Sequence, residues 1–152
     1  MAAAAKQVPP TPAAPPPWPI IITEWALQSY LDLVHAKTFS KAEYQKVIRP
    51  DVVLLREGIP SPHLKFQNGK FWGPANVGTQ LLPSGYKMKW RQLGNGKVQL
   101  RFPVTTIYPP RTTCLCAAYV KDSPQVDLRM MARFKTHMNL ISQGRFVHRG
   151  TL

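Results

Sequence analysis

The segment from Tyr86 to Phe102 constrains the fold more than any other part of the chain. Apolar and basic side chains alternate along it on both sides of the tripeptide Gly94-Asn95-Gly96. Alternation with a period of two is typical of a β-strand, and Gly-Asn-Gly is typical of a tight turn. The segment therefore predicts a β-hairpin with one apolar face and one cationic face.

The register of this hairpin follows from parity, because residues paired across two strands lie on the same face. A two-residue turn would pair Arg91 with Leu100 and mix charged with apolar side chains. A three-residue loop instead pairs Trp90 with Leu100 and places Lys89 opposite Arg101. We favour the second register because it separates the two faces. Its cationic face is either solvated or covered by a polyanion.

Charge is distributed unevenly along the chain. The 152 residues contain 20 basic and 7 acidic side chains, a formal net charge of +13, and no acid lies between Gly58 and Lys121. The bases of that span are Lys65, Lys70, Lys87, Lys89, Arg91, Lys97, Arg101, Arg111 and Lys121. Such an asymmetry indicates an anionic partner: nucleic acid, an anionic membrane or an acidic protein surface.

The two cysteines, Cys114 and Cys116, are one residue apart, which is too close for an unstrained disulfide. We expect both to be reduced and buried, as in an intracellular protein. The sequence shows no membrane-spanning run and no secretory or mitochondrial leader. We therefore expect the cytoplasm or the nucleus.

The composition predicts two regions. Residues 1–19 are rich in proline and alanine and read as a flexible arm, which is either a spacer or a docking peptide for a protein partner. Residues 20–152 read as a single basic α+β domain. We divide this domain into a helical pair (23–49), an antiparallel sheet of about five to seven strands (51–120), an amphipathic helix (123–143) and a basic tail (144–152).

Capping signals place the helices. Thr23 can cap a first helix to about His35, and Ser40 opens a second helix that Pro50 should end. The pair is either a helix-turn-helix or, more commonly, a plain αα-hairpin. Ser123-Pro124 begins the last helix, whose apolar stripe is Leu128, Met131, Phe134, Met138 and Ile141. The basic tail either adds an edge strand or stays loose.

Further strands are expected on both sides of the main hairpin. Residues 51–56 read as a buried strand, and Asn68-Gly69 predicts a short hairpin. Residues 77–85 read as a loop, while 104–108 and 112–120 read as strands. Short turns between these strands favour an antiparallel sheet.

No catalytic, metal or cofactor motif is present in the sequence. A metal-independent ribonuclease is the one enzymatic alternative, with His63, His137 and His148 as acid and base groups. Another alternative is a structural or matrix-like component, either of a larger assembly such as a viral one or of an anionic membrane surface.

We expect non-enzymatic binding of RNA or single-stranded nucleic acid through a cationic sheet face, with aromatic side chains among the bases for stacking. The predicted binding residues are Lys65, Lys70, Trp72, Lys87, Lys89, Arg91, Lys97, Arg101, Arg111, Arg129 and Arg133. We expect no cofactor and no metal.

Overall fold

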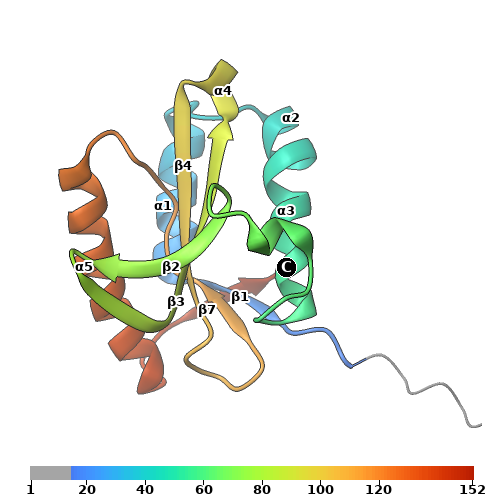
Figure 1. The fold of residues 1–152 in the computed structure, drawn as a ribbon, viewed down its shortest axis with the longest axis vertical. Coiled ribbons are helices and arrows are strands. Elements are labelled where there is room, and N and C mark those ends of the chain that lie inside the picture. Colours follow the sequence, from blue (N-terminus) through green and yellow to red (C-terminus); the bar gives the residue numbers. More distant parts are fainter. Residues whose placement is uncertain (1–14) are drawn as a thin grey trace, which may run out of the picture.

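The computed structural model describes residues 15–152 and has the predicted α+β architecture (Figure 1). The elements in chain order are β1 (Ile20–Thr23), α1 (Glu24–His35), α2 (Lys41–Glu43), η1 (Tyr44–Ile48), α3 (Arg49–Val53), η2 (Leu54–Glu57), η3 (Leu64–Gln67), β2 (Trp72–Val77), β3 (Gln80–Gln92), α4 (Leu93–Gly96), β4 (Val98–Thr105), β5 (Thr113–Leu115), β6 (Tyr119–Val120), α5 (Pro124–Ser142) and β7 (His148–Thr151). Most of the predicted arm lies outside the described residues. Trp18, at its end, already belongs to the folded body, because its backbone N–H donates to the Arg56 carbonyl at 2.8 Å.

The seven strands form one mixed sheet in the order β2-β3-β4-β5-β1-β7. β6 pairs with the first half of β4, and β5 pairs with its end. All pairs are antiparallel except β1 and β5, which run parallel. The predicted elements begin at residue 23, but residues 20–22 already belong to β1, because the apolar side chains of Ile20 and Ile21 are buried in the sheet. The basic tail adds the edge strand β7 beside β1.

The main hairpin, β3–β4, has the predicted register. Trp90 pairs with Leu100 and Lys89 pairs with Arg101. The tip is one left-handed turn, because Gly94, Asn95 and Gly96 all have positive φ. Leu93 pairs with Val98 at this turn, so the register slips by one residue at the very tip.

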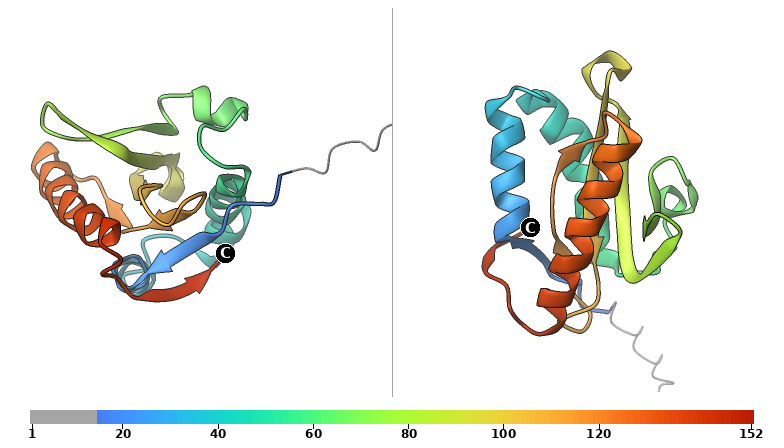
Figure 2. Two further views of the ribbon diagram at one scale, coloured as in Figure 1. Left: turned by 90° about the horizontal axis from the view of Figure 1, so that it is seen from below. Right: turned by 90° about the vertical axis from the view of Figure 1, so that its left-hand side faces the viewer.

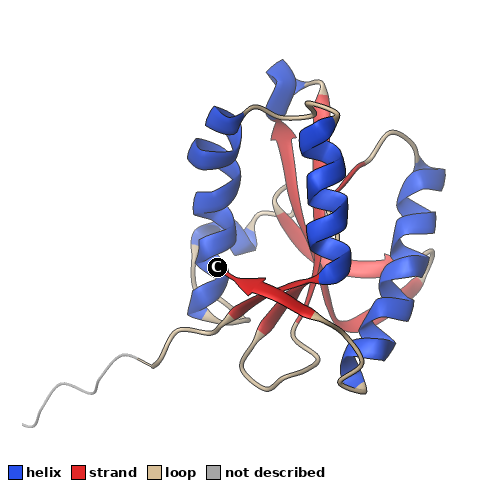
Figure 3. Ribbon diagram, turned by 180° about the vertical axis from the view of Figure 1, so that it is seen from behind, coloured by secondary structure: helices blue, strands red, loops and turns tan. Residues whose placement is uncertain are grey.

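Helices cover both faces of the sheet, and each covered face has its own apolar core (Figures 2 and 3). α1 and the helical segment of residues 41–57 lie on the face that buries Met88, Trp90 and Phe102. α5 lies on the other face through Met131, Phe134, Met138 and Ile141, as its predicted stripe requires. Leu128, the first residue of that stripe, is exposed instead.

The prediction of a strand over residues 51–56 is wrong. Helical turns continue from residue 41 to residue 57, and Ile48, Val52 and Leu55 are buried at helical spacing. Pro50 does not end the helix because it follows the π-helical turn η1. In this wider turn the proline ring does not clash with the preceding turn, and no hydrogen bond is lost for want of a proline N–H.

The predicted hairpin at Asn68-Gly69 is also wrong. Residues 64–67 form the 3₁₀ helix η3, and the Asn68 side chain accepts a hydrogen bond from the Lys70 N–H, which shapes a local turn. The real hairpin joins β2 to β3 around Gly78, so most of the loop predicted at residues 77–85 is strand. The observed arrangement buries Phe66 and Phe71 in the same core as Met88, Trp90 and Phe102, which favours it over the predicted hairpin.

The cysteine prediction agrees with the structure. Cys114 and Cys116 are both free and buried in the core beneath α5. Burial raises the pKa of the Cys114 thiol to about 12, and it also raises that of Cys116. Both groups therefore serve as small apolar side chains.

Candidate nucleic-acid interface

Three neighbouring strands bring basic side chains together on the sheet face that carries α5. Lys89 on β3 pairs with Arg101 on β4, and Arg101 pairs with Tyr119 on β6. Side chains alternate along each strand, so these three lie on the face opposite Trp90 and Leu100. The row Lys89–Arg101–Tyr119 is the centre of the candidate site.

Arg101 has an unusual environment for an arginine. It is only 4% exposed and forms no ion pair within residues 15–152, but its nitrogens are not among the buried unpartnered atoms there, and its charge interacts with that of Asp127. Removing a charge from water costs several kcal/mol unless an opposite charge compensates it. Among the described residues, only the through-space attraction of Asp127 offsets the burial of the Arg101 charge.

The side chains around Arg101 are mostly basic as well. Burial lowers the pKa of Lys89, and the positive charges of Arg101, Lys87, Arg91 and Lys121 lower it further. Burial also lowers the pKa of Lys87. Repulsion that contributes to a pKa shift requires that the charges lie close together. We call Lys87, Lys89, Arg91, Arg101 and Lys121 the sheet-face cluster.

Asp127, in the first turn of α5, is the one carboxylate paired with this cluster among the described residues. It accepts a 2.6 Å hydrogen bond from the Tyr119 hydroxyl and lies 3.5 Å from Lys87 Nζ. Burial alone would raise the pKa of Asp127, but the hydrogen bond and the nearby cations lower it overall. Asp127 thus stays ionised and is shared by Lys87, Arg101 and Lys121, so one carboxylate faces the five cations of the cluster among the described residues.

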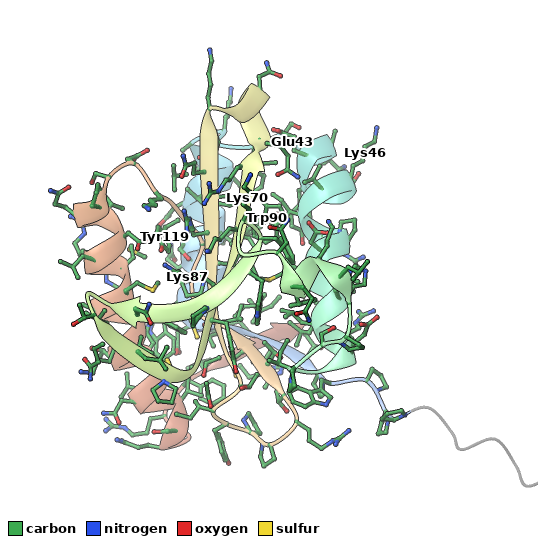
Figure 4. The ribbon with its side chains drawn as sticks, in the orientation of Figure 1. Glu43, Lys46, Lys70, Lys87, Trp90 and Tyr119 are labelled. Atoms are coloured by element: carbon green, nitrogen blue, oxygen red, sulfur yellow. The ribbon has the colours of Figure 1, made fainter. Side chains whose placement is uncertain are left out.

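Two hollows flank the cluster. The first lies between η3 and β3 and is lined by Lys65, Lys70, Lys89 and Arg91 together with the buried rings of Phe71 and Trp90. Asp51, also in its wall, is occupied, because it accepts from Trp90 Nε1 at 2.9 Å and pairs with Lys65. The second lies at the start of α5, with Lys87 and Lys121 in its wall. In Figure 4, Lys70 and Trp90 lie at the hairpin, while Lys87 and Tyr119 lie nearer α5.

The structure gathers six of the predicted binding residues around this surface: Lys65, Lys70, Lys87, Lys89, Arg91 and Arg101. The remaining cations lie elsewhere. Lys97 is exposed at the hairpin tip, and Arg111 lies 5.9 Å from the ring of Trp18. Arg129 is exposed on α5, and Arg133 lines a separate groove between α1 and α5.

Lys121 is the one cluster member that the predicted site lacked. It joins the cluster because its backbone N–H donates to the Gln99 carbonyl at 2.9 Å and holds it beside β4. Its position two residues after Tyr119, and so on the same strand face, is the signal that could have identified it.

Trp72, the predicted stacking residue, does not share the cationic face, and Tyr119, which does, holds Asp127 through its hydroxyl. Trp72 pairs with Met88 and therefore lies on the opposite face, where it is half-buried rather than exposed. Its ring stacks on Tyr86 with 4.9 Å between centroids and meets Phe66 edge-on at 4.7 Å. Basic and aromatic residues that alternate in the sequence thus lie on opposite faces of the sheet. The cluster therefore offers charge rather than a stacking surface.

The three histidines have unrelated surroundings. His63 caps η3 by accepting from the Lys65 N–H, His137 stacks on Trp25 at 4.0 Å, and His148 is exposed in β7. η3 and α5, which carry or adjoin the first two, lie on opposite sides of the molecule (Figures 1 and 2). The structure does not bring the three histidines together.

Comparison with known proteins finds no matching family model, no similar curated protein and no similar solved structure. Within the described residues, no helix is both long enough and apolar enough to cross a bilayer. In the same part of the chain, no three His, Cys, Asp or Glu side chains are grouped as metal ligands.

Proposed function

We propose that this protein binds RNA or another single-stranded nucleic acid without catalysis, through the sheet-face cluster and the adjoining Lys65 and Lys70. The observation that carries the proposal is the excess of positive charge around Arg101, a residue that is 4% exposed and shares a single nearby carboxylate, Asp127, with the lysines of the cluster. A phosphate group matches the fork of donors on an arginine and relieves the repulsion among its neighbours.

The shape of the surface favours a flexible strand over a duplex. The cluster is set back between η3 and the start of α5, and its central residue is almost completely covered. A single strand can bend into such a recess, whereas a stiff duplex meets only the outer cations. Because Trp72 lies on the other face and Tyr119 is buried against α5, affinity should come from phosphate contacts, with weak sequence preference and steep salt dependence.

A charge-neutralised variant tests the proposal. Lys70, Lys89, Arg91 and Lys121 are changed together to Gln, and the matched control changes Lys37, Lys41, Lys46 and Arg49, four exposed cations of the helical side. Lys46 lies on that side of the molecule in Figure 4. Both variants lose the same net charge, so any difference between them reports position.

Fluorescence anisotropy with a labelled single-stranded RNA over a salt series gives the readout. Each phosphate contact contributes about −0.7 to the slope of log Kobs against log salt, so the cluster variant should lose up to about 3 units of slope. The control should keep the wild-type slope. Equal losses in both variants would refute the assignment, as would retention by anionic vesicles without any binding to RNA.

A further inference from the structure

The outer face of α1 carries a row of apolar side chains. Leu27, Leu31 and Val34 follow the spacing of a helix, so they lie on one side of it. Leu31 is 38% exposed and Val34 is 39% exposed, although both side chains are apolar. In Figure 3 α1 lies in front of the sheet, and no other element of the described chain covers its outer face. We call these three residues the α1 stripe.

The apolar surface continues beside the stripe. Leu27 also lines a pocket of about 110 Å³ between α1 and the helical segment of residues 41–57. Tyr30 of the same helix and Tyr44 and Val52 of the segment lie in the wall of this pocket as well. Single exposed apolar residues are ordinary on a protein surface, whereas a row of them beside an apolar pocket is typical of a docking surface.

The charge of this side of the molecule indicates the partner. Residues 24–57 contain five acidic and five basic side chains, whereas the remainder of the chain contains 15 bases and 2 acids. An anionic partner is attracted to the basic remainder, and two copies of the chain repel each other there. On the helical side two copies can approach without net repulsion. A second copy of this chain is therefore the occupant that suits the stripe.

α1 is also complementary to itself. Glu24 in its first turn and His35 in its last extend the row of the stripe at opposite ends. The Val147 N–H donates to Glu24 Oε2 at 3.0 Å and holds this carboxylate in place. When two copies of α1 lie antiparallel along their full length, Leu27 of one copy lies beside Leu31 of the other. Glu24 then lies beside His35 at both ends, as a two-fold symmetric contact requires.

We infer that two copies of this chain associate through antiparallel contact of their α1 stripes. A helix of 12 residues is about 18 Å long, so the contact is smaller than the usual interface of about 800 Å² per partner, and association should be weak. The sheet-face cluster lies on the other face of the sheet, so both clusters of the dimer stay open. The inference does not depend on the proposed function.

Sedimentation equilibrium of the full, nuclease-treated chain, from micromolar to millimolar concentration, tests the inference. The apparent mass should rise with concentration from 17.1 kDa toward twice that value. Leu31→Glu places a charge at the centre of the contact and should weaken association at least about ten-fold. Leu128→Glu makes the same charge change at an exposed leucine of α5 and should leave association as in the wild type. Circular dichroism should show both variants folded, because both side chains are exposed in the single chain.

Two changes at His35 test the antiparallel orientation. His35→Lys should strengthen association several-fold and His35→Glu should weaken it, because each dimer contains two contacts of this residue with Glu24. In a parallel pair the residue would face its own copy. His35→Lys would then weaken association, which would refute the antiparallel pairing.

The other outcomes are equally decisive. A chain that stays at 17.1 kDa over the whole concentration range refutes the inference, as does a dimer that persists in Leu31→Glu. Equal weakening by Leu128→Glu also refutes it, because the effect would then not depend on position. Leu31→Glu should still bind single-stranded RNA, so failure of this inference leaves the proposed function standing.

Discussion

Replacing Arg101 by Met should stabilise the free protein while it removes ligand binding. Met keeps the unbranched aliphatic volume of the arginine stem and deletes its charge. The guanidinium has no ion pair among residues 15–152 although the residue is 4% exposed. Its loss therefore breaks no ion pair among these residues and removes only the through-space attraction of Asp127.

The magnitude follows from the neighbouring charges. Lys87, Lys89 and Lys121 repel Arg101, and Asp127 attracts it, which leaves two repulsions uncompensated. At roughly 8 Å and an effective dielectric constant of about 40, each repulsion costs about 1 kcal/mol. The free energy of unfolding should rise by about 2 kcal/mol, within the range of about 1 to 4 kcal/mol for replacement of buried ions by apolar residues. For a domain of this length the melting temperature should rise by about 4 to 8 °C.

Thermal unfolding followed by circular dichroism at low ionic strength measures this change. Single-stranded RNA should raise the melting temperature of the wild type and have little effect on the variant. Lys46→Met, at an exposed position outside the cluster, is the control and should change stability by less than about 0.5 kcal/mol. A melting temperature of Arg101→Met several degrees below that of the wild type would show that Arg101 stabilises the free fold, and the reasoning would then be wrong.

Three further changes test other parts of the structure. Asp51→Ala should cost about 2 to 3 kcal/mol in urea denaturation because the buried Trp90 N–H loses its acceptor; Asp51→Asn retains an acceptor, and an equal loss would contradict this account. Glu43→Ala should cost about 1 kcal/mol and speed hydrogen exchange at the Gly94 N–H, which Glu43 accepts at 2.9 Å; an unchanged exchange rate would argue against that contact. Burial lowers the pKa of His137 to about 4, so the unfolded chain binds its proton first, and stability should fall by about 1 to 2 kcal/mol as pH drops from about 6.5 to 4. His137→Phe keeps a ring in place and should reduce this acid loss, and an unchanged pH profile would exclude the histidine as its source.

Local rules predicted the hairpin because its information is local. A period of two and a turn rich in glycine fixed which residues pair, and the observed pairing of Trp90 with Leu100 follows. Local rules failed at residues 51–56, where Val52 and Val53 favour a strand and Pro50 suggests a stop. The helix continues there because burial of Val52 and Leu55 against the first core outweighs local propensity.

The candidate site was predictable to the same extent. Parity correctly separates Lys89 from Trp90, but the aromatic content of the span suggested a mixed surface, and Trp72 instead packs on the far side of the sheet. Lys121 and Asp127 come close to the cations of the hairpin only because distant segments pair, and composition and spacing do not encode that pairing. The shortage of negative charge around Arg101 also becomes visible only in three dimensions.

The position of β1 has a consequence for the order of events during synthesis. This early strand pairs with residues 113–115 on one side and with residues 148–151 on the other. Both partners leave the ribosome long after β1 does, and loops that join distant segments close slowly. The β2–β3–β4 meander, by contrast, can form from a continuous segment. The cationic hairpin should therefore form first, and Ile20 and Ile21 should stay exposed to solvent until β5 and β7 have been synthesised and pair with β1.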